Sequence, residues 1–212
     1  MEKLDQSYGY ILYRSTVHGK SNLEKAKTVD CNDRAQVFVN NKHIITQFDK
    51  EIGENFKIDF PNETDNTLDI LVENVGRINY GTSLISPNQR KGIRGGVMLD
   101  IHSHTGFDHY TLDLENIDKV DFSKDYIEKT PAFYSYEFNI DEKCDTFLHV
   151  NDFSKGCAFI NGFNLGRFWD LGPTNYLYIP APLLNLGKNE IIIFETEGKY
   201  SDSITLSNKP LY

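Results

Sequence analysis

The sequence contains little cysteine and no long apolar segment. Only Cys31, Cys144 and Cys157 carry thiols among its 212 residues, and their odd number and irregular spacing fit neither a disulfide framework nor a zinc motif. We expect buried, reduced thiols, since free cysteine packs as a small apolar side chain. No apolar run approaches the roughly 18 residues that a membrane-spanning helix needs. The opening MEKLDQSYGY lacks the apolar core of a signal peptide.

Positive charge is also scarce. The formal net charge is -9, with 22 lysines and arginines against 31 aspartates and glutamates. Nucleic acids and anionic membrane surfaces are bound through a concentrated basic face, so we expect neither as a partner. Aromatic residues make up 13% of the chain, and they supply large apolar areas for a core although the total hydrophobic fraction is modest.

Short apolar or alternating runs, separated by turn residues, fill most of the chain. They predict strands at 8–16, 36–40, 44–48, 55–60, 68–73 and 92–101, and again at 157–160, 163–169 and 176–179. No segment of about ten residues shows the 3.6-residue period of an amphipathic helix. The polar stretch from His18 to Thr28 is expected to be a loop. This pattern is typical of an all-β sandwich.

The two halves of the chain repeat one pattern. VFVNNKHI at 37–44 parallels AFINGFNL at 158–165, and LDILVEN at 68–74 parallels NEIIIFE at 189–195. Asp69 follows Asn40 by 29 positions, and Glu190 follows Asn161 by the same 29 positions. The shared spacing between turn and strand predicts two copies of one β module.

Several rare strings, in order, give the chain a family resemblance. The main one is the stretch 155–180, KGCAFINGFNLGRFWDLGPTNYLYIP, which continues into APLL at 181–184. The others are GYILYRST at 9–16, DRA at 33–35 before VFVNNKHI, LDILVENVGRINYG at 68–81, PAFY at 131–134 and DTFL at 145–148. Together they resemble the C-terminal part of family 35 glycoside hydrolases, the β-galactosidases. The resemblance covers nearly the whole chain but does not include that family's catalytic (β/α)8 barrel.

The resemblance implies an all-β fold of two tandem galactose-binding-like jelly-roll β-sandwiches, at 1–112 and 113–212, with a linker region at 113–130. It implies non-catalytic C-terminal β-domains of a β-galactosidase, whose parent enzyme hydrolyses terminal β-galactosides with retention. These domains would brace the barrel of the same polypeptide, with a contribution to substrate access as a further expectation. An apolar patch is expected where the barrel docks. No cofactor is implied. The compartment stays open, and is cytoplasmic if the parent also lacks a signal peptide.

Catalytic residues are not expected in this chain. Glycoside hydrolysis uses two facing carboxylates, and the resemblance places the family's pair in the absent barrel. None of Glu73, Glu190 and Glu195 lies in a matching motif. Glu73 and Glu195 are expected at strand ends, either solvated or paired with arginine.

Metal binding is not expected either. His102, His104 and His109 form the sequence's histidine cluster, and the first two would share one face of a strand. A zinc site needs further ligands, and the segment is interrupted by serine and glycine. We therefore interpret these as surface histidines.

One stretch combines the residue types of a sugar site. Arg167, Trp169 and Tyr176 supply aromatic faces and a guanidinium, and Asn161 and Asn164 add amides. Apolar walls with a few polar groups are typical of small-molecule pockets. The alternative is that these aromatics pack in the core or against a neighbouring domain. The functional alternatives that remain are an independent carbohydrate-binding module for β-galactosides and a domain pair without activity of its own.

Overall fold

The computed structural model describes residues 1–173 and 175–210, which form two compact units, Met1–Glu115 and Asn116–Tyr212. Residues 174 and 211–212, which belong to the expected second module, lie outside the described part. Within that part the regular structure is antiparallel strand, and the helices are 3-10 turns of three or four residues. The all-β prediction is confirmed. None of the described helices has the length and apolar character to cross a membrane.

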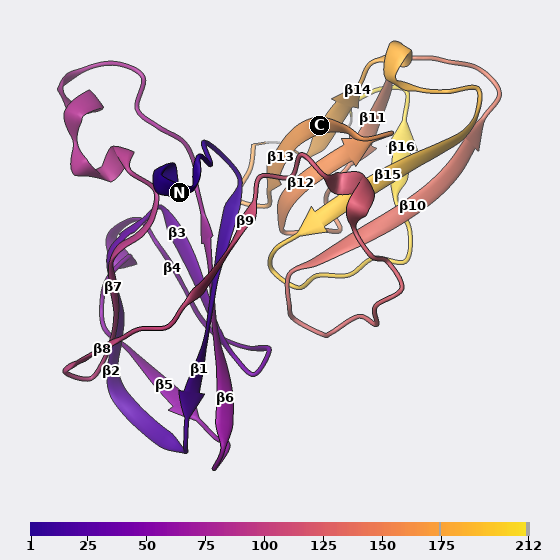
Figure 1. Cartoon of the computed structure of the whole chain (residues 1–212). Coiled ribbons are helices and arrows are strands. Elements are labelled where there is room, and N and C mark those ends of the chain that lie inside the picture. The colour runs from indigo at the N-terminus through magenta and orange to yellow at the C-terminus, as the bar shows by residue number, and fades with distance from the viewer. Residues whose placement is uncertain (174, 211–212) are drawn as a thin grey trace. The chain divides into compact units, whose positions relative to one another are not determined.

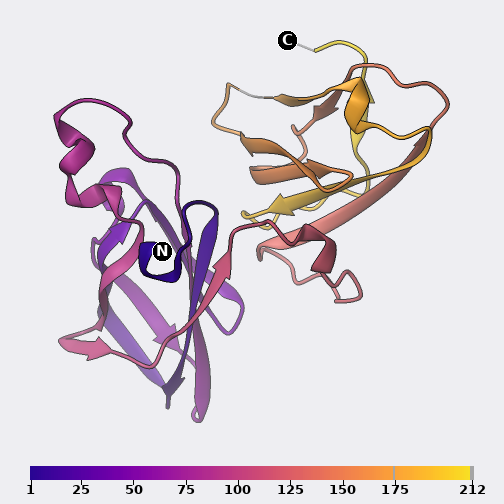
Figure 2. The same ribbon diagram turned by 45° about the horizontal axis from the view of Figure 1, so that its top comes forward.

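The first unit is a sandwich of two antiparallel sheets (Figures 1 and 2). Their strand orders are β4-β3-β6-β1-β9 and β5-β2-β7-β8. The strands are β1 Tyr10–His18, β2 Ser21–Asn32, β3 Arg34–Val39, β4 Lys42–Phe48, β5 Phe56–Phe60, β6 Asp65–Glu73, β7 Gly92–Leu99, β8 His102–His104 and β9 Asp108–Leu112. The core lies between the sheets, where alternate apolar residues of facing strands, such as Ile11, Val37 and Ile58, are at most 2% exposed.

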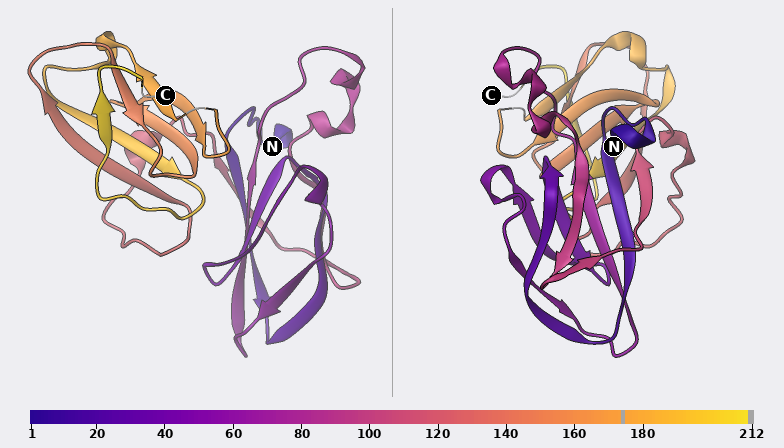
Figure 3. Two further views of the ribbon diagram at one scale, coloured as in Figure 1. Left: turned by 180° about the vertical axis from the view of Figure 1, so that it is seen from behind. Right: turned by 60° about the vertical axis from the view of Figure 1, so that its left-hand side comes forward.

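The second unit is a smaller sandwich with its own core (Figure 3). A four-stranded sheet of order β10-β15-β12-β13 faces a three-stranded sheet of order β14-β11-β16. The strands are β10 Ala132–Ile140, β11 Thr146–His149, β12 Lys155–Ile160, β13 Phe163–Trp169, β14 Tyr176–Ile179, β15 Gly187–Glu195 and β16 Thr205–Ser207. The central strands β12 and β15 are almost wholly buried, which matches their continuous apolar runs.

Strand β2 overturns the loop predicted for His18 to Thr28. It pairs with both β5 and β7, and its register shifts twice along the way. The residues that it buries are small, namely Ala26, Thr28 and Cys31. Because bulges break the two-residue period and the inward side chains are small, the strand carried no clear apolar alternation in the sequence.

One asparagine side chain closes a turn in each unit. Asn40, at the end of β3, accepts a hydrogen bond from the backbone N–H of Thr67 at 2.8 Å and donates to Asn66 Oδ1 at 3.0 Å. Asn161, at the end of β12, accepts from the backbone N–H of Glu190 at 3.0 Å and donates to Asn189 Oδ1 at 2.9 Å. Both turn asparagines have positive φ, 51° and 48°, which asparagine tolerates better than most residues.

The second asparagine of each pair holds the loop that precedes its strand. Asn66 exchanges two hydrogen bonds with the backbone of Asn62, and Asn189 exchanges two with that of Asn185. The equivalent pairs are 26 positions apart in the first unit and 28 in the second. The repeat is therefore present, and both counts of 29 positions hold, but Asp69 and Glu190 are not equivalent: Thr67 makes the hydrogen bond in the first unit that Glu190 makes in the second.

Replacing Asn161 with alanine is expected to lower the free energy of unfolding of the second unit by about 2–3 kcal/mol, because three hydrogen bonds are lost and alanine is strained at positive φ. Urea denaturation followed by fluorescence of Trp169, the chain's single tryptophan, measures the change. Asn164→Ala is the matched control, since its side chain accepts one local bond from Gly166 N–H. Equal losses for the two variants would contradict the role given to Asn161.

Candidate functional site

Of the predicted sugar-binding residues, the two asparagines are engaged in the hairpin between β12 and β13. The Asn161 amide donates to Leu183 O and Asn189 Oδ1, and its oxygen accepts from Glu190 N–H. The Asn164 oxygen accepts from Gly166 N–H at 2.8 Å. Asn161 therefore has both amide protons committed within the protein, and Asn164 keeps only part of its capacity for a ligand.

The other three predicted residues lie on neighbouring strands. Arg167 and Trp169 lie on one face of the edge strand β13. Tyr176 begins β14, and β14 contacts β13. Lys155 Nζ lies 4.4 Å from the centroid of the Trp169 ring, and the ring of Tyr176 meets that of Phe147 edge-on at 5.3 Å. The fold brings these side chains to one region, but the rings already have protein partners. Their role in sugar binding stays a prediction.

Glu195 is a buried carboxylate that the sequence did not reveal. It ends β15 as expected, but its exposure is 0%, so the solvated or arginine-paired interpretation is wrong. One oxygen accepts from the backbone N–H groups of Ser154 and Lys155, and the other from those of Glu197 and Lys199, at 2.9–3.3 Å. Burial raises the pKa of Glu195, and the N–H groups oppose that rise. The residue fixes two loops and has no open face for catalysis.

Glu73 is buried as well, at 1% exposure. It lies at the end of β6, and its carboxylate is 3.8 Å from the guanidinium of Arg34, which is also buried. The prediction of a strand-end glutamate paired with arginine is confirmed here. The pair is internal, so it braces the sheet.

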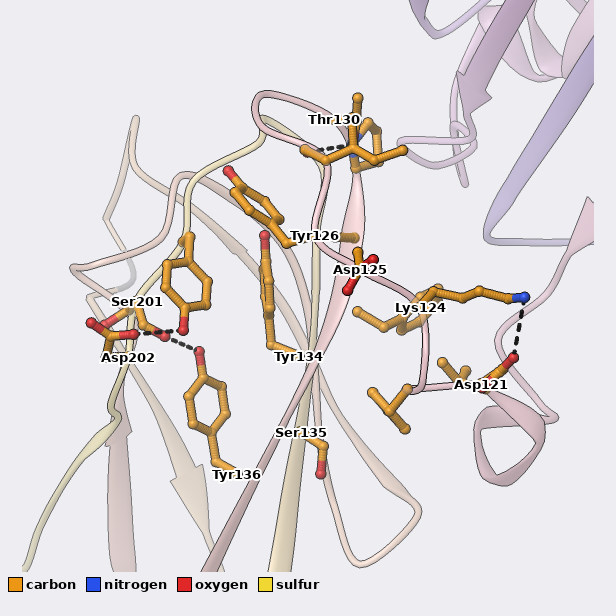
Figure 4. Close-up of a pocket in the computed structure, with 17 residues that line it drawn as sticks. Asp121, Lys124, Asp125, Tyr126, Thr130, Tyr134, Ser135, Tyr136, Ser201 and Asp202 are labelled. Atoms are coloured by element: carbon orange, nitrogen blue, oxygen red, sulfur yellow. Dashed lines mark hydrogen bonds and ion pairs between the residues drawn. The ribbon is translucent and has the colours of Figure 1, made fainter. Parts of the chain in front are cut away.

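A pocket walled by tyrosines opens on the second unit (Figure 4). It has a volume of about 510 Å³ and is formed by the segment 120–136 and by residues 200–202. The rings of Tyr126 and Tyr200 stack at 5.4 Å with 30° between planes, and Tyr134 lies 5.4 Å from Tyr200. Tyr126 and Tyr200 are 43% and 53% exposed, whereas Tyr134 is 9% exposed.

The hydroxyls of this pocket differ in their partners. Tyr126 donates to Gly198 O, Tyr136 to Ser201 O and Tyr200 to Asp202 Oδ1. The Tyr134 hydroxyl is buried and has no hydrogen-bond partner within the described residues. Burial raises the pKa of Tyr134, so this hydroxyl stays protonated and is available as a donor.

The charge on the pocket wall is negative. Its ionic residues are Asp121, Lys124, Asp125 and Asp202. Lys124 lies 3.7 Å from Asp121, which leaves two carboxylates without a neutralising cation in the wall. Asp202 already accepts from Tyr200. An anionic ligand is disfavoured at such a wall.

The first unit has a pocket of a different kind, about 430 Å³ in volume, at the end of β6. Lys91 is buried there and its Nζ lies 2.6 Å from Asp33 Oδ1. The other Asp33 oxygen accepts from the backbone N–H of Val75. Lys91 and Asp33 satisfy each other and act as a structural clamp, while Arg77 in the same wall pairs with Glu2.

The three histidines predicted as surface residues lie on β8 and β9. His104 Nε2 is 2.9 Å from Ser15 Oγ, and the ring of His109 packs edge-on against Tyr13 at 4.9 Å. Residues 1–173 and 175–210 contain no group of three or more His, Cys, Asp and Glu side chains arranged to hold a metal ion. No disulfide joins the described cysteines; Cys31 and Cys157 are buried and Cys144 is exposed, so the prediction of burial is wrong for Cys144.

Comparison with known proteins assigns both units to domain types of one enzyme family. Residues 1–113 match the first all-β domain of β-galactosidases, and residues 131–189 match the galactose-binding domain of β-galactosidases. Among solved structures, the apo lectin of Pleurotus ostreatus aligns with 94% of this chain and 70% of its own at 14% identity. Its TM-score of 0.31 is too low to support an argument.

Curated relatives are longer proteins. Beta-galactosidase 1 of Dictyostelium discoideum is 36% identical over 92% of this chain and 32% of its own length. Beta-galactosidase-1-like protein 2 of Homo sapiens is 38% identical over 90% of this chain and 30% of its own length. The beta-galactosidase of Xanthomonas manihotis is 36% identical over 84% of this chain and 29% of its own length. The chain thus spans about a third of the length of the relatives it matches. With a β-galactosidase domain matched in each unit, the chain belongs to the β-galactosidase family and comprises its non-catalytic β-domains.

Proposed function

We propose that this chain is the accessory part of a β-galactosidase that hydrolyses terminal β-galactosides with retention, through a glycosyl-enzyme. The observation that carries the proposal is the match of both units to β-galactosidase domains over only about a third of the relatives' length. In this proposal the units brace a catalytic barrel of the same polypeptide and shape the approach to it.

The segment between β6 and β7 supports a docking role. It includes the 3-10 turns η3 Thr82–Ile85 and η4 Pro87–Gln89 and extends from one end of the first sandwich (Figure 2). Tyr80 and Ile85 on this segment are 81% and 93% exposed, and Ile78 and Leu84 are nearly half exposed. Clustered apolar side chains in water mark an interaction surface, and the remaining two thirds of such an enzyme is the partner that the proposal assigns to it.

The purified chain is expected to show no hydrolysis of a chromogenic β-galactoside above a heat-denatured control. The physical reason is that the proposal assigns the catalytic carboxylates to the other two thirds of such an enzyme, whereas Glu73 and Glu195 of this chain are buried in structural bonds. Turnover that persists through repurification would refute the accessory role.

A chimera tests the bracing role directly. In the Xanthomonas manihotis enzyme, the region matched by this chain is either deleted or replaced by this chain, and soluble yield and β-galactosidase activity are compared. The deletion is expected to be insoluble or inactive, and the replacement is expected to recover soluble, active enzyme. A replacement no better than the deletion would count against bracing.

A further inference from the structure

The pocket of Tyr126, Tyr134 and Tyr200 has an unmet hydrogen-bond donor at its base. Tyr134 is 9% exposed and its hydroxyl has no partner within the described residues. A buried hydroxyl without an acceptor costs free energy, and an incoming acceptor would remove that cost. Figure 4 shows the hydroxyl end of Tyr134 directed toward Tyr126, which belongs to the segment before β10. A ligand that bonds to this donor has to displace the Tyr126 ring, which stacks on Tyr200 and donates to Gly198 O.

The pocket wall offers aromatic surface to the same ligand. Tyr126 and Tyr200 are both about half exposed, although large aromatic side chains gain most by burial. They stand in a concave site of about 510 Å³, a volume within the range of small-molecule pockets. A ligand that can lie on a ring face would cover surface that now faces water.

Charge limits the chemistry of that ligand. Asp125 and Asp202 are not neutralised within the wall, so phosphates, sulfates and carboxylates would be repelled. Carboxylates accept hydrogen bonds from hydroxyl groups, and these bonds are stronger than neutral ones.

A quaternary ammonium ion needs several ring faces around one empty centre. Here the rings of Tyr126, Tyr134 and Tyr200 lie 5.4–6.2 Å apart and pack on one another, so they enclose no such centre.

We propose that this tyrosine pocket is a binding site for a neutral saccharide. The apolar C–H face of the sugar lies on the ring of Tyr200 or Tyr126, a sugar oxygen accepts from the Tyr134 hydroxyl, and sugar hydroxyls donate to Asp125 and Asp202. The site is separate from the stretch of Arg167 and Trp169. It does not rest on the accessory role, because sugar binding to the chain alone is measured without any catalytic partner.

Nuclear magnetic resonance titration of the isotope-labelled whole chain tests the proposal. Galactose and lactose are added up to high millimolar concentration, because monosaccharides gain little net free energy per hydroxyl. Saturable shifts are expected at the rings of Tyr126, Tyr134 and Tyr200, with the Trp169 ring unmoved. Absence of shifts with either sugar, shifts centred on Trp169, or shifts with choline chloride but with neither sugar would each overturn it.

Two substitutions sharpen the test. Tyr134→Phe is expected to leave the melting temperature unchanged or higher, since it removes an unsatisfied hydroxyl, yet to weaken saccharide binding by about fivefold or more, a factor equivalent to one hydrogen bond. Tyr200→Ala is expected to abolish detectable binding. Tyr178→Phe, on the exposed face of β14, is the matched control and is expected to bind as the unmodified chain does. Unchanged affinity in both pocket variants would refute the site.

Discussion

Replacing Glu195 with alanine is expected to lower the free energy of unfolding of the second unit by about 3–5 kcal/mol. The carboxylate accepts four backbone N–H groups, from Ser154, Lys155, Glu197 and Lys199. Ser154 and Lys155 are buried, so their N–H groups would lose this acceptor in a place that water does not reach. Urea denaturation followed by Trp169 fluorescence reports on this unit.

Two further variants separate the carboxylate from its charge. Glu195→Gln keeps one acceptor oxygen but turns an NH2 group toward two N–H donors. The decrease in the free energy of unfolding is therefore expected to lie between zero and the decrease caused by Glu195→Ala. Glu190→Ala is the matched control on the same strand, because its carboxylate makes one exposed bond to Ser135, and its loss is expected to stay below about 1 kcal/mol. If Glu195→Ala cost no more than this control, the bridging role would be untenable.

Replacing Gly156 with alanine is expected to be more damaging still, with a loss of more than about 4 kcal/mol or a failure of the second unit to fold. A Cβ at this position would stand 1.8 Å from the backbone oxygen of Phe194 and 3.1 Å from the ring of Phe168. Gly156 lies on β12, which pairs with β15 in the centre of the sheet. Backbone cannot give way there without separating the two strands.

Gly187→Ala provides the comparison. Gly187 has φ of +79°, but a Cβ there meets nothing within 4 Å, so alanine is expected to cost only the strain of the left-handed region, about 1 kcal/mol. Soluble yield and denaturation midpoints of the two variants give the measurement. Comparable losses would show that the close approach of β12 and β15 relaxes easily.

The sequence predicts many of the strands whose inward residues are large and regularly spaced, but not β10, where Tyr134, Tyr136 and Phe138 alternate toward the core. Strand β5 has Phe56, Ile58 and Phe60 facing inward, and its alternation is plain in the sequence. Strand β2 was missed because bulges interrupt its alternation and its buried residues are small. Bounds shifted by one to three residues at most predicted strands, since a strand's end depends on pairing with residues distant in sequence.

The candidate site was less predictable than the fold. Residue type alone predicts a sugar site at Arg167 and Trp169. No local sequence pattern indicates that the Asn161 amide is hydrogen-bonded within the turn. The tyrosine pocket joins 120–136 to 200–202, and such a meeting follows only from the path of the chain. The sequence predicts a strand-end Glu195 that is solvated or paired with arginine, because charged side chains are seldom fully buried. Its four partners are backbone N–H groups, and every residue except proline has such a group, so the sequence does not indicate them.

The paired asparagines limit how either unit can diverge. In each pair, one member holds a turn, the other holds a loop, and the bond between them joins the two. A change at Asn161 removes one hydrogen bond from the Asn189 side chain, which keeps its bonds to Asn185 and Gly187. A change at Asn189 removes one from the Asn161 side chain, which keeps its bonds to Leu183 and Glu190. Because that bond joins the turn to the loop, a substitution at either position weakens the hold on both. The two units can therefore differ in length between these positions, 26 against 28, while keeping the same joint.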